Sequence, residues 1–345
     1  MSSGDGAAAT RQRRSLVGNW RYALSTTNMP PGATDPVTRW LVLTRAAVLP
    51  MTLVSATAAG LLAVRQPGFS FAWYALAVVG LLLAHAGNNL MNDLFDLEAG
   101  SDTWEYPRAL YAPHPVLSGM ISRRGLAAAA ALVNLADAAI LVVLRAARGW
   151  PVVAFALAGL FVSAAYTAPP LRLKKRGLGE PSVLLVWGPL MVGGTYYAAT
   201  GRVSWSVIAA SIPYALLATS VLMGKHIDKI PWDAPARTRT LPVVIGERPA
   251  RVLTKGMMAG FYVSIVALVA SGILPWPAVV GLLGVTRLVR VWNAFGRPKP
   301  DGPPPELPNY PVWPLWFAAG AFVHARRAGA LFVLGLAIAA IFNIT

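Results

Sequence analysis

The sequence predicts an all-α, polytopic membrane protein built as a bundle of nine transmembrane helices. Of its 345 residues, 56% are hydrophobic and only 13% are charged, and the mean hydropathy is +0.54. Soluble domains carry about 25% charged residues. The apolar residues gather in nine stretches, each long enough to cross a bilayer as an α-helix. These spans cover residues 41–64, 71–92, 124–144, 150–167, 181–200, 205–224, 254–274, 275–292 and 328–344.

The basic residues support this span count and predict a topology. The net charge is +16, and 26 of the 30 lysines and arginines fall on one side of the membrane when they are assigned to the predicted connections. The others are Arg65, Arg145, Arg148 and Arg202. The positive-inside rule then places the N-terminus in the cytoplasm and the C-terminus outside, in a bacterial plasma membrane. Topology and anionic lipid headgroups account for most of this charge, so we expect membrane lipids and no nucleic acid as partners.

The chain divides into a polar tail and one membrane domain. Residues 1–35 are predicted to be a disordered cytoplasmic tail, and residues 36–345 form the nine-helix domain. The first thirty residues lack the apolar core of a cleavable signal peptide. Residues 296–314 are rich in proline and are predicted to be a linker. The absence of cysteine excludes disulfides, thiolate metal sites and cysteine nucleophiles.

Four oxygen-bearing side chains lie on one stripe at the end of the second predicted span. They are Asn89, Asn92, Asp93 and Asp96, whose spacing of three or four residues places them on one helix face. Each carboxylate at membrane depth costs at least about 2.5 kcal/mol, so it is retained where it binds something. Carboxylate and amide oxygens suit Mg²⁺, which completes its shell with water and substrate phosphates. The stripe therefore predicts a magnesium site for a phosphate-bearing substrate; the alternative is a helix end exposed to headgroups.

A second acidic motif ends the sixth predicted span. It reads Lys225-His226-Ile-Asp228-Lys229-Ile-Pro-Trp-Asp233. Two acidic sites in two halves of a bundle can face each other and hold two or three Mg²⁺ ions, which neutralise a diphosphate leaving group. We predict Asp228 and Asp233 as ligands. They are five residues apart, about 140° around an ideal helix, and Pro231 lies between them, so we expect a turn to deliver Asp233.

These motifs resemble those of a known family. Asn89-Leu-Met-Asn92-Asp93-Leu-Phe-Asp96 resembles the first Asn/Asp-rich motif of the UbiA superfamily of intramembrane prenyltransferases. Residues 228–246 resemble the second, although its usual spacing is Asp-x-x-x-Asp. Tyr166-Thr-Ala-Pro-Pro-Leu-Arg172-Leu-Lys174, followed by Gly177-Leu-Gly-Glu180, is similar to the exit of the fourth helix in the branch that prenylates 1,4-dihydroxy-2-naphthoate. The resemblance covers residues 40–345 and implies nine transmembrane helices with active-site loops on the cytoplasmic side.

The resemblance implies a reaction and a set of site residues. The reaction is Mg²⁺-dependent transfer of a polyprenyl group from a polyprenyl diphosphate to a small aromatic acceptor similar to dihydroxynaphthoate, with release of pyrophosphate, as in menaquinone biosynthesis. The predicted catalytic residues are Asp93, Asp96, Asp228 and Tyr166, the last facing the allylic cation. The predicted substrate-binding residues are Asn89, Arg108, Arg172, Lys174, Lys225 and Arg239. The predicted metal ligands are Asn89, Asn92, Asp93, Asp96, Asp228 and Asp233.

Two other functions fit the same pattern. A membrane terpene cyclase of this fold ionises the same diphosphate and lets the cation close on itself, and the altered second motif is compatible with that reaction. A non-catalytic carrier of isoprenyl lipids binds the diphosphate and releases no pyrophosphate. The product separates the three: a prenylated aromatic compound, a cyclic terpene formed without an acceptor, or no product.

Overall fold

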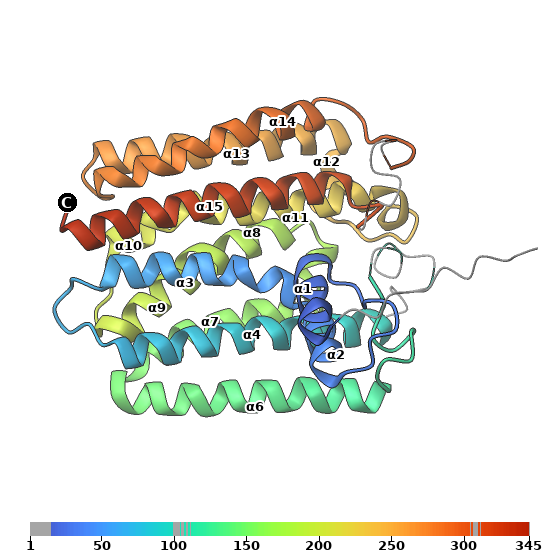
Figure 1. Ribbon diagram of the computed structural model, residues 1–345, viewed down its shortest axis with the longest axis horizontal. Helices are drawn as coiled ribbons and strands as arrows, with labels where there is room; N and C mark the ends of the chain where they lie inside the picture. Colours follow the sequence, from blue (N-terminus) through green and yellow to red (C-terminus); the bar gives the residue numbers. More distant parts are fainter. Residues whose placement is uncertain are drawn as a thin grey trace, which may run out of the picture.

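The computed structural model describes residues 15–98, 104, 107, 110, 112–303, 305, 310 and 312–344. Within them, nine helical segments are long and apolar enough to cross a membrane, and each corresponds to one predicted span. Their bounds are Ala46–Ala63, Phe71–Glu98, Arg123–Arg148, Trp150–Thr167, Gly179–Thr200, Trp205–Asp233, Glu247–Ala270, Trp276–Phe295 and Trp316–Phe342. They run side by side along the long axis of the molecule (Figure 1). The predicted number of spans is confirmed.

Several spans are built from more than one helical element. The α-helices are α1 (Leu16–Thr26), α2 (Pro36–Leu43), α3 (Leu49–Ala63), α4 (Phe71–Glu98), α6 (Arg123–Arg148), α7 (Trp150–Thr167), α8 (Gly179–Leu185), α9 (Met191–Thr200), α10 (Trp205–Ala210), α11 (Ile212–Asp233), α12 (Leu241–Ile245), α13 (Glu247–Ala270), α14 (Val285–Phe295) and α15 (Trp316–Phe342). Three 3₁₀ segments are η1 (Ala46–Val48), η2 (Leu173–Lys175) and η4 (Trp276–Gly284), and η3 (Val186–Leu190) is a π-helical turn that contains Pro189. A proline removes one helical hydrogen bond, which accounts for the irregular turn.

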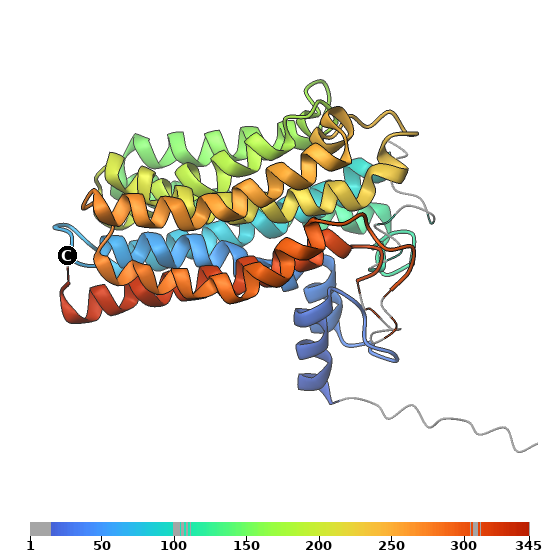
Figure 2. The ribbon, with the colours of Figure 1, turned by 90° about the horizontal axis from the view of Figure 1, so that it is seen from above.

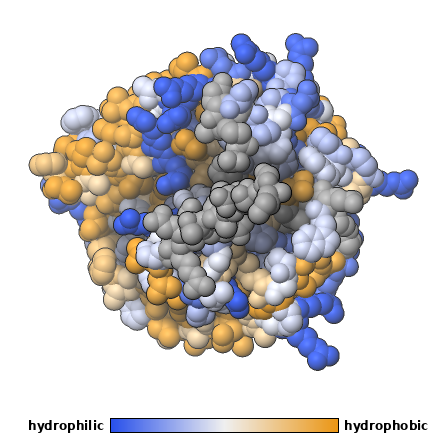
Figure 3. Space-filling view, turned by 45° about the vertical axis from the view of Figure 1, so that its right-hand side comes forward, coloured by the Kyte–Doolittle hydropathy of each residue, from blue (hydrophilic) through white to orange (hydrophobic). Residues whose placement is uncertain are grey.

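The connections fall alternately at the two ends of the bundle. Residues 112–122, 168–178 and 234–246 lie at the end that also carries α1 and α2, and the C-terminus lies at the opposite end (Figure 1). An odd number of crossings produces this arrangement. Viewed toward the end with α1 and α2, hydrophilic side chains gather around the rim and hydrophobic ones cover much of the flank (Figure 3). Both sequence motifs end at this polar end.

The N-terminal segment corrects one prediction. Ser15 caps α1 by accepting a hydrogen bond from the Gly18 amide, and Asp35 caps α2. The Asp35 carboxylate also accepts from the Thr38 hydroxyl at 2.7 Å and the Trp20 indole at 3.2 Å, and these bonds lower its pKa to about 2. These two helices project sideways from the bundle near its polar end, roughly perpendicular to the long helices (Figure 2). The expected disorder is therefore wrong for residues 15–35, where Ser15 and the Asp35-Pro36 pair were helix-start signals; residues 1–14 lie outside the described part.

Several helices extend beyond the apolar spans predicted for them, and three of these extensions affect the motifs or the charge count. α4 continues from the predicted end at residue 92 to Glu98, α11 continues from 224 to Asp233, and α15 begins at Trp316 rather than at 328. A helix need not stop where its apolar run stops, so both acidic motifs are helical. Because α15 begins early, Arg326 and Arg327 lie inside it and not in the preceding connection, where the charge count had placed them.

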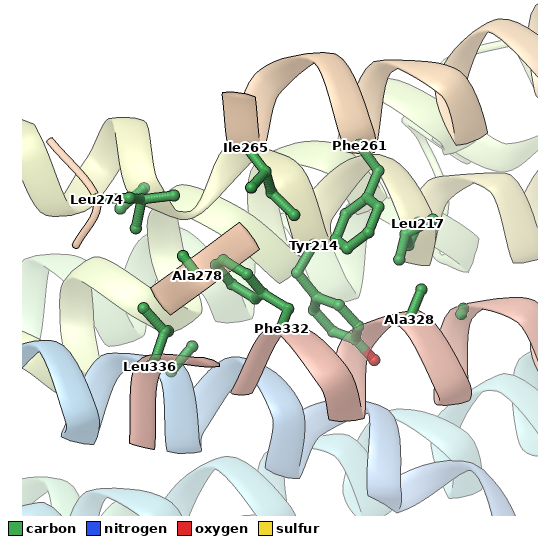
Figure 4. Close-up of a cluster of buried hydrophobic side chains, with 12 residues drawn as sticks. Tyr214, Leu217, Phe261, Ile265, Leu274, Ala278, Ala328, Phe332 and Leu336 are labelled. Atoms are coloured by element: carbon green, nitrogen blue, oxygen red, sulfur yellow. The ribbon is translucent and has the colours of Figure 1, made fainter. Parts of the chain in front are cut away.

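The core of the bundle lies around α11. Of the most apolar 18-residue window of the span that contains it, 67% is buried. Tyr214 and Leu217 of α11 pack with Phe261 of α13 and with Phe332 and Leu336 of α15, and η4 closes one side (Figure 4). This packing fixes α11, which carries the second motif, against α15.

A glycine controls how closely α11 and α15 approach at the polar end. A Cβ atom on Gly224 would lie 2.8 Å from the Ala318 amide nitrogen and from the Phe317 carbonyl oxygen, which are backbone atoms that cannot turn aside. We expect Gly224→Ala to destabilise the protein by about 1–3 kcal/mol, as overpacking does. The matched control is Gly256→Ala in α13, where the added Cβ would meet nothing within 4 Å. Thermal unfolding in detergent measures both, and equal melting temperatures would contradict the close contact.

Candidate metal and diphosphate site

The stripe on α4 turns inward toward the start of the bundle. Asn89 and Asp93 are 5% and 0% exposed, respectively. The Asn89 side-chain amide donates to the Thr44 carbonyl at 2.9 Å, and the Asp93 carboxylate forms an ion pair with Arg45. Thr44 caps the end of α2, and Arg45 follows in the left-handed conformation. The connection between α2 and α3 therefore covers the first motif, and Arg45, which the sequence suggested only as a topology signal, contacts the predicted site directly.

Asp96 joins the first motif to the loop after α7. Its two carboxylate oxygens accept hydrogen bonds from the Lys174 ammonium group at 2.9 and 2.7 Å. Lys174 lies in η2 and is 8% exposed. One turn back along α4, the buried Oδ1 atom of Asn92 accepts no hydrogen bond within the described residues. An orphaned buried amide oxygen beside two carboxylates is a suitable ligand atom for a hard cation.

The second motif reaches the same lysines through Asp233. α11 continues through Pro231 to Asp233, which is 1% exposed, so the helix itself and not a turn delivers this carboxylate. Lys229 lies one helical turn earlier, with its Nζ atom 3.9 Å from the Asp233 carboxylate. Lys175 interacts electrostatically with both Asp96 and Asp233. The two acidic motifs, more than a hundred residues apart, therefore meet around one group of lysines.

Asp228 has a different environment. Its two carboxylate oxygens accept hydrogen bonds from the Phe317 and Ala318 amides at 3.1 and 2.9 Å, at the start of α15. The Lys299 ammonium lies 3.8 Å from the same carboxylate. A carboxylate at a helix N-terminus satisfies amides that have no partner within the helix. The structure thus gives Asp228 a capping role, and from the second motif we carry only Asp233 forward as a metal ligand.

The other predicted site residues lie at varying distances from this centre. Tyr166, at the end of α7, has its ring beside Gly179, where an added Cβ atom would lie 3.3 Å from it, and interacts electrostatically with Glu180, Asp96 and Asp233. Lys225 is half-buried on α11, one turn before Lys229. Arg172 and Arg239 are exposed; a parallel backbone bridge between Arg176 and Arg239 joins their loops. Arg108 lies outside the described residues.

A buried pair that the sequence did not suggest joins α11 to α8. His226 of α11 and Glu180 of α8 are 2.7 Å apart, from Nδ1 to Oε1, and both are almost completely buried. The other oxygen of Glu180 accepts no hydrogen bond within the described residues. A Cβ atom on the neighbouring Gly179 would lie 3.3 Å from the Tyr166 ring and 3.5 Å from the His226 ring. Gly179 and Glu180 belong to the Gly-Leu-Gly-Glu sequence, which resembles that of the naphthoate branch. No local sequence pattern predicts that this segment contacts the second motif on α11.

The charges at the site are balanced pair by pair. Asp93 contacts Arg45, Asp96 contacts Lys174, and Asp233 lies near Lys229. Among the described residues, no group of three or more His, Cys, Asp or Glu side chains is close enough to hold a metal ion. Such an arrangement suits a divalent cation and a phosphate-rich anion bound together. The carboxylates would bind the cation, and the lysine ammonium groups would bind the phosphates.

Comparison with known proteins agrees with this geometry. The model of the UbiA prenyltransferase family matches residues 53–305. The chain is 27% identical over 278 residues to a 2-carboxy-1,4-naphthoquinone phytyltransferase of Synechocystis sp., covering 77% of this chain and 85% of the relative. It is 30% identical over 225 residues to a 1,4-dihydroxy-2-naphthoate octaprenyltransferase of Mycobacterium tuberculosis, covering 63% and 73%. A digeranylgeranylglyceryl phosphate synthase of Natronomonas pharaonis is 29% identical over 239 residues, covering 65% and 76%.

Solved structures share the fold. A UbiA homolog from Archaeoglobus fulgidus bound to GPP and Mg²⁺ superposes with a TM-score of 0.55 at 15% identity, covering 87% of this chain and 99% of that one. The predicted nine-helix bundle of this type is therefore confirmed. The family model spans most of the chain, including both acidic motifs and the loop that carries Lys174. The chain belongs to the UbiA prenyltransferase family.

Proposed function

We propose that this protein uses Mg²⁺ to transfer a polyprenyl group from an allylic diphosphate to an aromatic acceptor similar to 1,4-dihydroxy-2-naphthoate, releasing pyrophosphate. The observation that carries the proposal is the meeting of the α4 stripe and Asp233 around Lys174 and Lys175 at the polar end of an apolar bundle. The relatives named as naphthoate and naphthoquinone prenyltransferases support this acceptor class. We place the site on the cytoplasmic face of a bacterial plasma membrane, following the positive-inside rule.

The residues present fit Mg²⁺. Asn92, Asp93, Asp96 and Asp233 supply the oxygen donors that this ion prefers, and the Oδ1 atom of Asn92 is buried with no hydrogen-bond partner in the described chain. Asn89 donates its side-chain amide to the Thr44 carbonyl, so its own oxygen remains an acceptor that we propose as a further ligand. When bound, Mg²⁺ neutralises the diphosphate and makes it a better leaving group.

The basic residues bind the diphosphate and orient it. Lys174 and Lys175 lie on η2, with Lys229 on the opposite element α11, so the donor's phosphates are held between two parts of the chain. We expect Lys174 to exchange its contact with Asp96 for one with the diphosphate as metal binds. Arg172 and Arg239, which are exposed on the adjoining loops, attract the anion during its approach.

The apolar interior shields the reacting carbon. The isoprenoid tail would lie along the bundle below the α4 stripe, open to lipid. There His85, one turn from Asn89, contacts the Trp187 ring edge-on at 5.2 Å between centroids. Aromatic faces such as Tyr166 and Trp187 stabilise a developing allylic cation and keep water away from it. A ring carbon of the acceptor then forms the new carbon–carbon bond as the bond to the diphosphate breaks, and the same ring carbon loses its proton, or its carboxyl group as CO₂, so that the ring becomes aromatic again.

Product analysis tests the proposal directly. Purified protein in detergent is incubated with Mg²⁺, geranylgeranyl diphosphate and dihydroxynaphthoate, and products are identified by mass spectrometry. We expect a prenylated naphthalene compound and an equal amount of pyrophosphate, both abolished by chelation of Mg²⁺. A cyclic terpene formed equally well without acceptor would replace the proposal with a cyclase. Binding of the donor without pyrophosphate release, for every acceptor offered, would replace it with a carrier.

Donor binding is expected to weaken as the pH rises into the alkaline range. Burial and the neighbouring charge of Lys174 lower the pKa of Lys175 in the free protein, and the donor's diphosphate would raise it again. At pH values above the pKa of Lys175 in the free protein, binding therefore takes up a proton, and the dissociation constant rises with pH. Below that pKa, Lys175 is already protonated and makes no contribution to the pH dependence of binding. Calorimetry with an unreactive donor analogue measures this. Lys175→Arg, which stays charged, should flatten the profile; an unchanged profile would contradict the role.

A further inference from the structure

Four arginines gather on one outer face of the bundle, away from the proposed site. Arg287 and Arg290 lie on α14, and Arg326 and Arg327 lie on α15. Three are exposed, and Arg287 is half-buried. The two helices run antiparallel, because a Cβ atom on Gly320 would meet Val291 at 3.7 Å and one on Gly284 would meet Ala328 at 2.8 Å. Arg287 lies between these two contacts in sequence, as do Arg326 and Arg327, so the four side chains share one region.

A pocket of about 240 Å³ lies between the helices at this region. Arg287 and Arg290 line one wall, and Tyr310, Trp316, Gly320 and Val323 line others. Gly320 leaves space that a side chain would fill. Arg327 follows Val323 by four residues and extends the same helix face one turn deeper along α15. Arg326 beside it lies over the Phe322 ring, 5.7 Å from the ring centroid. The pocket is therefore basic at its wall and along its inner edge.

This charge has no acidic partner within the described chain. α14 and α15 contain no Asp or Glu, and beyond Glu247 the whole sequence has only Asp301 and Glu306. None of the four arginines forms an ion pair with a described carboxylate. Topology explains arginines at helix ends, whereas Arg326 and Arg327 lie ten and eleven residues into a 27-residue helix. Arginines at such positions are costly unless an anion compensates them.

The surroundings identify the kind of anion. Apart from the two arginines and Tyr310, the pocket is lined by apolar residues: Val291, Ala294, Trp316, Ala319, Gly320 and Val323, the last of which is 45% exposed. A free phosphate has no use for such a border, whereas lipid acyl chains would cover it. Basic pockets between transmembrane helices are a known kind of headgroup site. We propose that an anionic phospholipid binds here, its phosphate held by Arg287 and Arg290 and its chains lying along α14 and α15.

The site has a structural consequence that goes beyond prenyl transfer. Trp316, in the pocket wall, directly precedes Phe317 and Ala318, whose amides hold Asp228. A lipid in the pocket would therefore stabilise the start of α15 and the end of α11 together. We expect phosphatidylglycerol, but not phosphatidylcholine, to raise the melting temperature of the purified protein.

Native mass spectrometry of the full chain with added phosphatidylglycerol or phosphatidylcholine tests the proposal. We expect selective phosphatidylglycerol adducts, bound about thirtyfold more weakly by the Arg287→Gln/Arg290→Gln variant. The matched control is Arg124→Gln/Arg248→Gln, which removes two exposed charges from α6 and α13 at the same end of the bundle. It should retain the adducts, and both variants should melt near the wild-type temperature without lipid, which shows that they fold.

Three outcomes would overturn the proposal. Equal binding of the two lipids would remove the role of headgroup charge. An equal loss of adducts in the control variant would show that general surface charge, not this pocket, attracts the lipid. Stabilisation by inorganic phosphate alone, as large as that by phosphatidylglycerol, would replace the lipid with a soluble anion. These readouts do not depend on prenyl transfer, so they stand apart from the test of the proposed function.

Discussion

Replacement of Asp93 by Asn is expected to lower the rate of pyrophosphate release by about 10²–10³-fold, the usual cost of removing one group that stabilises charge in a transition state. Asp93 is completely buried in the α4 stripe and paired with Arg45. Asn keeps the shape but loses the charge that we propose to bind Mg²⁺. The measurement is pyrophosphate release by the purified variant at saturating donor, acceptor and Mg²⁺.

Two controls separate this loss from unfolding. Breaking a buried ion pair on one side costs about 3–5 kcal/mol, so Asp93→Asn also threatens stability. The double variant Arg45→Met/Asp93→Asn removes both charges; it should recover stability and remain inactive. Asp35→Asn makes the same chemical change at the cap of α2, outside the site, and should retain activity. An active double variant would rule out Asp93 as a ligand.

The two aspartates of the second motif are expected to fail in different ways. Asp233→Asn should reduce turnover by about 10²-fold with a smaller fall in melting temperature than Asp228→Asn, because Asp233 lies 3.9 Å from Lys229 and near Lys175, at the proposed diphosphate site. Asp228→Asn should lower stability by about 1–2 kcal/mol, because each oxygen of Asp228 accepts a backbone amide of α15 and Asn has only one acceptor oxygen. Its turnover at low temperature should remain within several-fold of wild type.

Thermal unfolding and turnover, measured side by side, decide this point. A melting temperature that falls mainly for Asp228→Asn, with turnover that falls mainly for Asp233→Asn, supports the division. The reverse pattern would return Asp228 to the metal and make the capping contact secondary. The unusual five-residue spacing explains the division physically: on a continuous helix the two carboxylates point to different neighbours.

The fold was predictable because membrane spans depend mostly on local properties. Nine apolar stretches of bilayer length specified nine helices. Helix ends were less predictable, since α4 and α11 continue past their apolar residues to Glu98 and Asp233. The tail was misjudged because composition alone suggested disorder, whereas single residues, Ser15 and Asp35, start helices there.

The site was predictable in part. The spacing on α4 placed Asn89 to Asp96 on one stripe, and the resemblance singled out Lys174, which contacts Asp96. The capping role of Asp228 depends on α15, some ninety residues later, and no local pattern encodes such a contact. Arg45 and Glu180 were overlooked for the same reason: their partners, Asp93 and His226, lie far away in the sequence.

The central claim is that both acidic motifs bind the metal and the donor's diphosphate at one place. Mn²⁺, which accepts the same oxygen ligands as Mg²⁺, allows a direct test by pulsed electron paramagnetic resonance with an unreactive prenyl diphosphate. We predict a ³¹P coupling to Mn²⁺ in the wild type that is lost in Asp93→Asn and in Asp233→Asn and kept in Asp228→Asn and Asp35→Asn. A ³¹P coupling that survives both Asp93→Asn and Asp233→Asn would contradict it.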